Sequence, residues 1–197
     1  MRPACVIKIA HAGYLILCKI AQNLSAQKMK FRYTSILYEY SRWYAAMEES
    51  FSIELERLAD EQIQDDDHAA RRSRCERVCD IAVAGGISGG ADYYYAAVVL
   101  LHGETPEEFA TALHFARTAT QHHDPRAWSV VAATWDRLLI AKRRPQRFGT
   151  QFIRVDGQWG LGPVDEQISD AERAFYGVPP LWVQRKSAAA LQRYDQR

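Results

Sequence analysis

Two helix-start signals divide residues 91–141 into three short helical segments, and this punctuation restricts the fold more than any other feature. The stretch TPEE at 105–108 provides an N-cap, a proline at the first helical position and a glutamate that closes a capping box. The dipeptide DP at 124–125 provides a cap and a proline again. Because only short links join the three segments, neighbouring helices have to pack as antiparallel hairpins.

Each segment has an apolar face at helical spacing. We expect the first helix to run from about Ala91 to His102 and to end at Gly103 in a left-handed cap. In the second and third helices, residues three and four apart form the buried faces: Phe109, Ala112, Leu113, Ala116 and Ala119, then Trp128, Val131, Ala132, Trp135, Leu138 and Leu139. A similar pattern predicts a further helix upstream, starting at about Lys30.

Between these helices lies the polar stretch DEQIQDDDHAARRSRCER at 60–77. Its acidic residues precede its basic ones, so Asp67 and Arg71 fall four apart in the order that favours a helix. We interpret this stretch as a solvated helical face, because adjacent aspartates on a helix diverge and do not converge on an ion. AGGISGG at 84–90 lacks the lysine and the preceding strand of a phosphate loop, and it is interpreted as a link between helices.

Helical periodicity stops beyond Pro145. The stretch TQFIRVDGQWGL at 150–161 alternates around Asp156-Gly157, a dipeptide that suits a two-residue hairpin turn. A short helix capped by Ser169 and a final polar helix from about Trp182 are expected to follow.

The expected fold class is therefore mainly α: a bundle of antiparallel helical hairpins with a short C-terminal β-hairpin. A chain of 197 residues suits one domain. We expect this domain over residues 30–197, after an N-terminal extension of uncertain structure over 1–29.

Composition argues against several classes of protein. Lys plus Arg (25) almost balances Asp plus Glu (24), so we expect no nucleic-acid partner. The apolar run at 4–21 is interrupted by charged or polar side chains and makes a poor membrane span; it remains open as a targeting segment, a core element or an extension. The cysteines are too few for a secreted disulfide scaffold, which favours a cytoplasmic location. Cys75 and Cys79 are interpreted as two core-facing thiols.

Asp136 and Arg137 have apolar neighbours on almost every side of the third helix. A helix that is apolar all round is buried, and a buried charge without a partner is costly, so both need partners. We infer that Gln146, Thr150 or Gln151, in the stretch QRFGTQ, supplies them. That stretch is either a polar clasp that holds the hairpin on the bundle or the wall of a ligand pocket.

His102 is open to two interpretations. In the last turn of its helix it can act as a C-terminal cap; folded against Asp136, it can serve as a general acid or base. A metal alternative is that QHHD at 121–124, with His102 and Asp136, is similar to the ligand set of helical metal-dependent phosphohydrolases. Since Asp124 is already needed as a cap, we expect no metal ligand and no cofactor.

Three stretches together resemble an uncharacterised bacterial family, a domain of unknown function: WDRLL at 135–139, PQRFGTQ at 145–151 and GPVDEQISDAERAFYGVPPL at 162–181. The resemblance covers roughly residues 50–184. It implies that His102 matches a histidine of the family and Asp60–Gln62 its acidic-glutamine element, although Leu101 stands where that family has glutamine. The implied structure is an all-helical domain with a polar site.

Three hypotheses about function follow. In the first, the domain binds a small polar or anionic ligand, or a partner peptide, in a pocket walled by His102, Asp136, Arg137 and residues 146–151. Arg137 is then the anchor, with Gln146, Arg147, Thr150 and Gln151 as further ligand-binding residues. In the second, a hydrolase or group-transfer enzyme uses His102 as base and Asp136 to orient it. In the third, the protein is a structural helical adaptor.

Overall fold

The computed structural model describes residues 27–65, 67–155 and 157–195. The described chain is mainly helical, with one two-stranded antiparallel sheet, which confirms the expected fold class. The elements are α2 (Gln27–Gln64), α3 (His68–Ala84), α4 (Gly90–Leu101), α5 (Pro106–Gln121), α6 (Ala127–Ala141), β1 (Ile153–Val155), β2 (Gln158–Gly160), α7 (Asp170–Phe175) and α8 (Leu181–Asp195). The apolar run at 4–21 lies outside the described residues.

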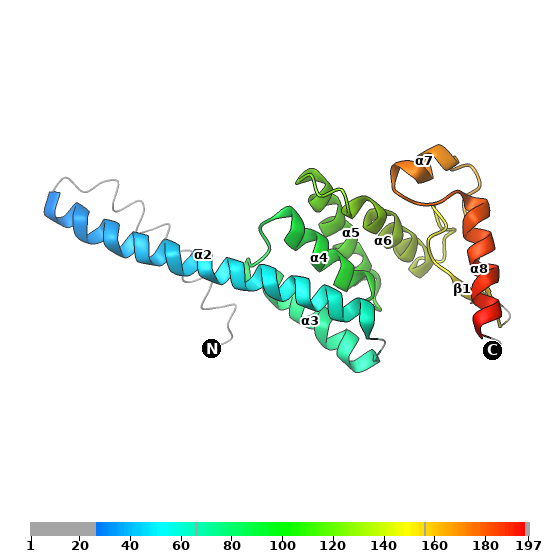
Figure 1. The fold of residues 1–197 in the computed structure, drawn as a ribbon, viewed down its shortest axis with the longest axis horizontal. Coiled ribbons are helices and arrows are strands. Elements are labelled where there is room, and N and C mark those ends of the chain that lie inside the picture. The colour runs from blue at the N-terminus through cyan, green and yellow to red at the C-terminus, as the bar shows by residue number, and fades with distance from the viewer. Residues whose placement is uncertain (1–26, 66, 156, 196–197) are drawn as a thin grey trace.

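Helix α2 is 38 residues long, which corresponds to roughly 57 Å at 1.5 Å per residue. Its first half extends away from the rest of the molecule, and its second half packs against α3 and α4 (Figure 1). Leu55, Leu58 and Ala59 bury their side chains there. The second half of α2 is therefore part of the core.

The polar stretch at 60–77 is mostly exposed, as expected, but it spans two helices and contains a buried arginine. The helix breaks after Gln64, and the Asp67 side chain caps α3 by accepting a 2.8 Å hydrogen bond from Ala70 N. Arg74 is buried, and its guanidinium donates to Gln62 Oε1 at 2.7 Å and to Asp65 Oδ2 at 3.0 Å. Most of the stretch is thus exposed as predicted, but Arg74 of α3 is buried against the end of α2 and the turn that follows it.

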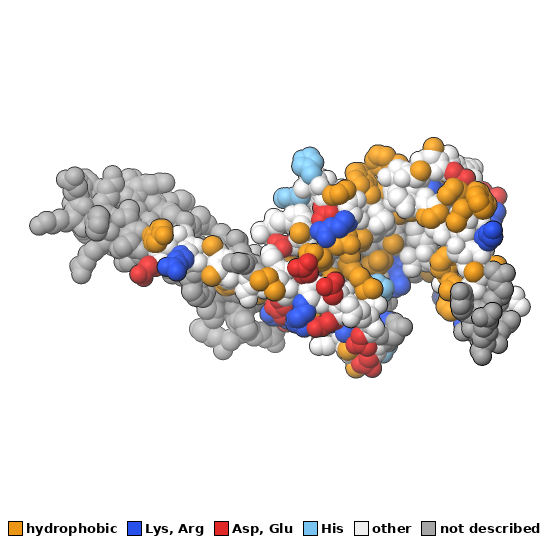
Figure 2. Space-filling view, viewed as in Figure 1, with side chains coloured by type: hydrophobic (Ala, Val, Ile, Leu, Met, Phe, Trp, Pro, Cys, Tyr) orange, Lys and Arg blue, Asp and Glu red, His pale blue; other side chains and the backbone are white. Residues whose placement is uncertain are grey.

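Helices α4, α5 and α6 lie side by side and form the predicted hairpins (Figure 1). Small side chains line their contacts and let the backbones approach closely: Ala96, Ala97, Ala112, Ala116 and Ala132 are all completely buried. Charged side chains of both signs are interspersed on the outer face shown in Figure 2. The apolar face predicted for α5 is buried as expected, although hydrophobic side chains are also visible on the face shown in Figure 2.

The predicted start of α5 is confirmed, while that of α6 is wrong by about half a turn. Thr105 Oγ1 accepts a hydrogen bond from Glu108 N, and Glu108 Oε2 accepts one from Thr105 N, which completes the capping box. Helix α6 begins at Ala127, because Asp124 folds its carboxylate over the turn and accepts hydrogen bonds from Arg126 N and from the Arg126 guanidinium.

Gly103 does not form the left-handed cap that we expected. Helix α4 ends at Leu101, His102 is its C-cap with a φ of −93°, and Gly103 keeps a negative φ. Gly103 is instead packed against Glu108, whose Oε2 would lie 2.7 Å from an added Cβ. The close approach of the next helix, rather than a positive φ, thus accounts for a glycine here.

The C-terminal elements pack around a second, smaller apolar cluster formed by Ala132, Phe148, Ile168 and Val178. Strands β1 and β2 pair with Val155 opposite Gln158, which confirms the predicted two-residue hairpin. Ser169 caps α7 by accepting from Glu172 N at 3.1 Å, also as predicted.

Cys75 is buried but Cys79 is exposed, so only one of the two expected core thiols faces the core.

Among the described helices, none combines the length and the apolarity that a bilayer crossing requires.

Candidate functional site

Asp136 is completely buried on α6, and its carboxylate accepts four hydrogen bonds from the segment that follows the helix. Oδ1 accepts from Arg147 N at 2.7 Å and from Phe148 N at 3.0 Å. Oδ2 accepts from Thr150 N at 2.9 Å and from Thr150 Oγ1 at 2.8 Å. Since a carboxylate offers about four acceptor positions, this side chain is fully used. The inference that Thr150 is a hydrogen-bond partner of Asp136 is confirmed.

Gln146 fixes the shape of the same segment from the other side. Its buried side-chain amide accepts from Gln151 N at 2.8 Å and donates to Gln151 O at 3.0 Å and to Leu161 O. Its backbone forms a parallel bridge with Val164. Gly149, with a φ of 80°, lets the chain reverse between these anchors. Residues 146–151 therefore form a polar clasp on α6.

Arg137 is placed differently from its neighbour. Its Nε donates to Gln151 Oε1 at 2.9 Å, and its guanidinium carbon lies 5.9 Å from the centre of the Phe109 ring. No carboxylate of a described residue forms an ion pair with it, and the bond from Nε is its only hydrogen bond to those residues. Burial lowers the pKa of Arg137, and the positive charge of Arg71 lowers it further. The half-buried cation is thus left without a counter-charge from the described chain.

Arg147 holds its guanidinium against aromatic rings at the surface of the clasp. Its guanidinium carbon lies 5.2 Å from the Trp135 ring centre, and Nη2 pairs with Glu172 Oε1 at 2.6 Å. Its Nε is buried and has no acceptor. The side chain therefore keeps one unused donor.

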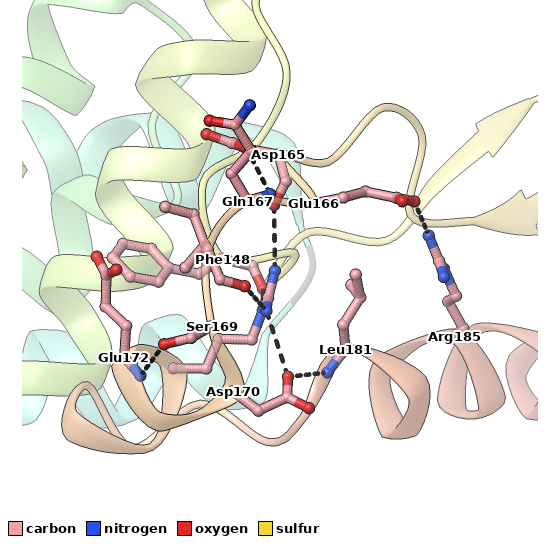
Figure 3. A network of polar contacts seen from close by, with 11 residues as sticks. Phe148, Asp165, Glu166, Gln167, Ser169, Asp170, Glu172, Leu181 and Arg185 are labelled. Carbon is pink, nitrogen blue, oxygen red and sulfur yellow. Dashed lines mark hydrogen bonds and ion pairs between the residues drawn. The ribbon is translucent and has the colours of Figure 1, made fainter.

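Arg173 joins the clasp to α7, and the sequence did not single it out. Its side chain is almost completely buried and donates to the backbone carbonyls of Phe148, Ile168 and Asp165. The same guanidinium contacts Asp170, which also accepts from Leu181 N; Figure 3 shows the polar contacts around Asp165, Asp170 and Phe148. A helix of six residues has too little periodicity to reveal a buried arginine.

The described residues do not form the single pocket that we expected. Three of its predicted residues line three separate pockets, and Asp136, Arg137, Gln146 and Gln151 line none of these three. Thr150 lines one of about 280 Å³ with Ala133 and Gln184. Arg147 lines one of about 600 Å³ at the C-terminal end of α6. His102 lines one of about 50 Å³ that also touches Arg71 and Glu108.

The hydrogen bonds that occupy Asp136 bear on the enzyme hypothesis. That hypothesis requires Asp136 to orient His102, but the four donors to its carboxylate all come from residues 147–150. His102 meets a different set of residues in its own small pocket. The two side chains predicted to act together thus have separate surroundings.

The metal alternative has no support in the part of the chain that the structure describes. There, no cluster of three or more His, Cys, Asp or Glu side chains could hold a metal ion. His122 and His123 are exposed, and the Asp124 carboxylate pairs with Arg126. The QHHD stretch is therefore a helix terminus followed by a turn.

Comparisons with protein-family models, with curated proteins and with solved structures returned no match for this chain. The resemblance to a bacterial domain of unknown function therefore stays a prediction.

Proposed function

We propose that this chain binds a small anionic ligand, a carboxylate or a phosphate, with Arg137 as the anchor. The observation that carries the proposal is the contrast within one dipeptide: Asp136 is fully occupied by the clasp, while Arg137 donates to the described residues only through Nε, so Nη1 and Nη2 make no bond to them. A planar guanidinium with two adjacent free N–H groups is suited to bidentate binding of either anion.

Electrostatics support the same choice of ligand. Burial and the nearby positive charge of Arg71 both disfavour the charged form of Arg137. A bound anion would offset both effects, because it supplies the counter-charge that Arg137 does not receive from the described residues. We propose binding rather than catalysis, because four donors already occupy the Asp136 carboxylate that the catalytic hypothesis needs to orient His102.

The class of partner and the cellular location are proposed from composition and from the cysteines. The almost equal numbers of basic and acidic residues favour a small ligand or a protein partner over nucleic acid. The free thiols of Cys75 and Cys79 are compatible with a reducing cytoplasm, where we place the protein.

Calorimetric titration with inorganic phosphate and, separately, with citrate tests the anchor. We expect saturable binding of at least one of these anions to the wild-type protein and a loss of about tenfold or more in affinity for Arg137→Gln. Arg137→Lys should fall between them, because it keeps the charge but not the planar pair of donors.

Arg57→Gln is the matched control, since Arg57 is an exposed arginine on α2 that pairs with Glu61. Its affinity should equal that of the wild type. Equal binding by Arg137→Gln and wild type, or no binding of either anion to the wild type, would remove Arg137 as the anchor.

A further inference from the structure

The largest of the pockets described above lies between the C-terminal end of α6 and the segment before α7. Its volume of about 600 Å³ falls within the range of roughly 300–1,000 Å³ that is typical of ligand pockets. Neither Asp136 nor Arg137 lines it, so it is separate from the anion site proposed above.

One part of the pocket is cationic. Arg144 is exposed and forms no ion pair with a described residue, and Arg147 also lines the pocket. The pairing of Arg147 with Glu172 and its position beside Trp135 hold its guanidinium in place. Such a pair of arginines is suited to a carboxylate.

The adjoining wall is apolar and rigid. It consists of Trp135, Leu139, Pro145 and Val164. The guanidinium carbons of Arg117 and Arg147 lie 4.7 Å and 5.2 Å from the centre of the Trp135 ring. These contacts leave the indole little freedom. An apolar group that packs on this wall therefore causes little further loss of side-chain conformational entropy.

The remaining wall offers hydrogen-bond acceptors. Asp165 and Glu166 line it; Asp165 Oδ1 accepts from Gln167 N at 3.0 Å, and Glu166 pairs with Arg185. In the parallel bridge, the backbone of Gln146 bonds to Pro163 O and to Asp165 N. The N–H and C=O of Val164, which lies between them, therefore point away from Gln146. Acceptors beside an apolar wall favour a ligand that carries N–H donors, which a simple fatty acid lacks.

We propose that this pocket binds the free carboxyl terminus of a peptide whose last side chain is apolar. The terminal carboxylate pairs with Arg144 and Arg147, the last side chain packs on Trp135 and Leu139, and the peptide N–H groups face Asp165. Capture of a chain terminus in this way combines a fixed charge with main-chain hydrogen bonds.

Calorimetric titration with acetyl-Gly-Ala-Leu tests the site in the full chain. The free acid should bind saturably. The C-terminal amide of the same peptide should lose about tenfold or more in affinity, because it lacks the charge that the arginines recognise. Octanoate, which has the carboxylate and an apolar tail but no N–H donors, should bind more weakly than the peptide. The indole N–H resonance of Trp135, identified with Trp135→Phe, should shift on addition of the free acid.

Variants of neighbouring cations provide the matched comparison. Arg144→Gln should weaken binding of the free acid by about tenfold, while Lys142→Gln removes the same charge outside the pocket and should change nothing. Arg137→Gln should also leave peptide binding unchanged, so this site and the proposed anion site can fail independently. Equal affinity for acid and amide, octanoate binding as tightly as the peptide, or no binding of the free acid at millimolar concentration would overturn the proposal.

Discussion

Thr150 donates both its backbone N–H and its hydroxyl to Oδ2 of Asp136, at 2.9 Å and 2.8 Å. A residue in a loop thereby completes the coordination of a carboxylate buried 14 positions earlier on a helix. This pairing separates the roles of two neighbours. Asp136 holds the clasp in place, and Arg137 is left for the proposed ligand.

Removing the charge of Asp136 should destabilise the protein strongly. Asp136→Asn replaces one acceptor oxygen with an amide that faces backbone donors, and we expect a loss of roughly 3 kcal/mol in the free energy of unfolding. Thr150→Ala removes a single hydroxyl donor and should lose about 1–2 kcal/mol. Urea denaturation measures both values; an Asp136→Asn variant as stable as wild type would contradict the structural role of the carboxylate.

The amide of Gln146 should not tolerate replacement by a carboxylate. Gln146→Glu places an acceptor against the carbonyls of Gln151 and Leu161, and we expect a loss of about 3 kcal/mol or more. Gln167→Glu makes the same change at an exposed position and should stay within about 0.5 kcal/mol of wild type. Chemical denaturation of the two variants measures both losses. Similar free energies of unfolding for Gln146→Glu and Gln167→Glu would show that the buried amide contributes little.

Two glycines allow backbone strain to be separated from crowding. Gly149 and Gly157 have almost the same positive φ, 80° and 78°, so alanine at either should cost about 1 kcal/mol in conformational strain. An added Cβ would lie 3.3 Å from Leu181 at Gly149 but would meet nothing within 4 Å at Gly157. Thermal unfolding should therefore show a larger loss for Gly149→Ala, and the reverse order would be inconsistent with the packing of α8 on the clasp.

The Asp124–Arg126 pair should make stability depend on pH. Hydrogen bonds from Arg126 hold the pKa of Asp124 below its usual value. A carboxyl whose pKa is lower in the folded state stabilises the protein above its unfolded pKa, and this contribution is lost as the pH falls through the folded pKa.

Asp124→Asn should therefore be less stable than wild type at pH 7, with a difference that shrinks as the pH falls below about 4. Denaturation curves at several pH values measure this difference. A gap that is constant over the whole range would show that the charge of Asp124 does not matter.

The sequence predicted those features whose causes are local. Caps such as Thr105 and Ser169, and the Asp156-Gly157 turn, depend on residues only a few positions apart. The buried charges on α6 could also be found, because apolar periodicity marked their surroundings and a polar stretch followed.

Other features depend on contacts that a pattern does not contain. Gly103 resembled a cap, but the approach of Glu108 explains it. Arg74 lies in a polar stretch, where an arginine is normally exposed, and Arg173 lies in a helix too short to show periodicity. Only the fold brings carbonyls and carboxylates around each of them. The separation of His102, Arg147 and Thr150 into different pockets likewise depends on the packing of the helices and could not be read from the sequence.

The separate roles of Asp136 and Arg137 are tested most directly by the unfolding midpoint with and without phosphate, compared among wild type, Thr150→Ala and Arg137→Gln. Thr150→Ala should unfold at a lower temperature than wild type yet keep its phosphate-dependent rise in midpoint. Arg137→Gln should stay within about 1 kcal/mol of wild type without phosphate and lose that rise. A full phosphate-dependent rise in Arg137→Gln would contradict the assignment of Arg137 as the ligand anchor.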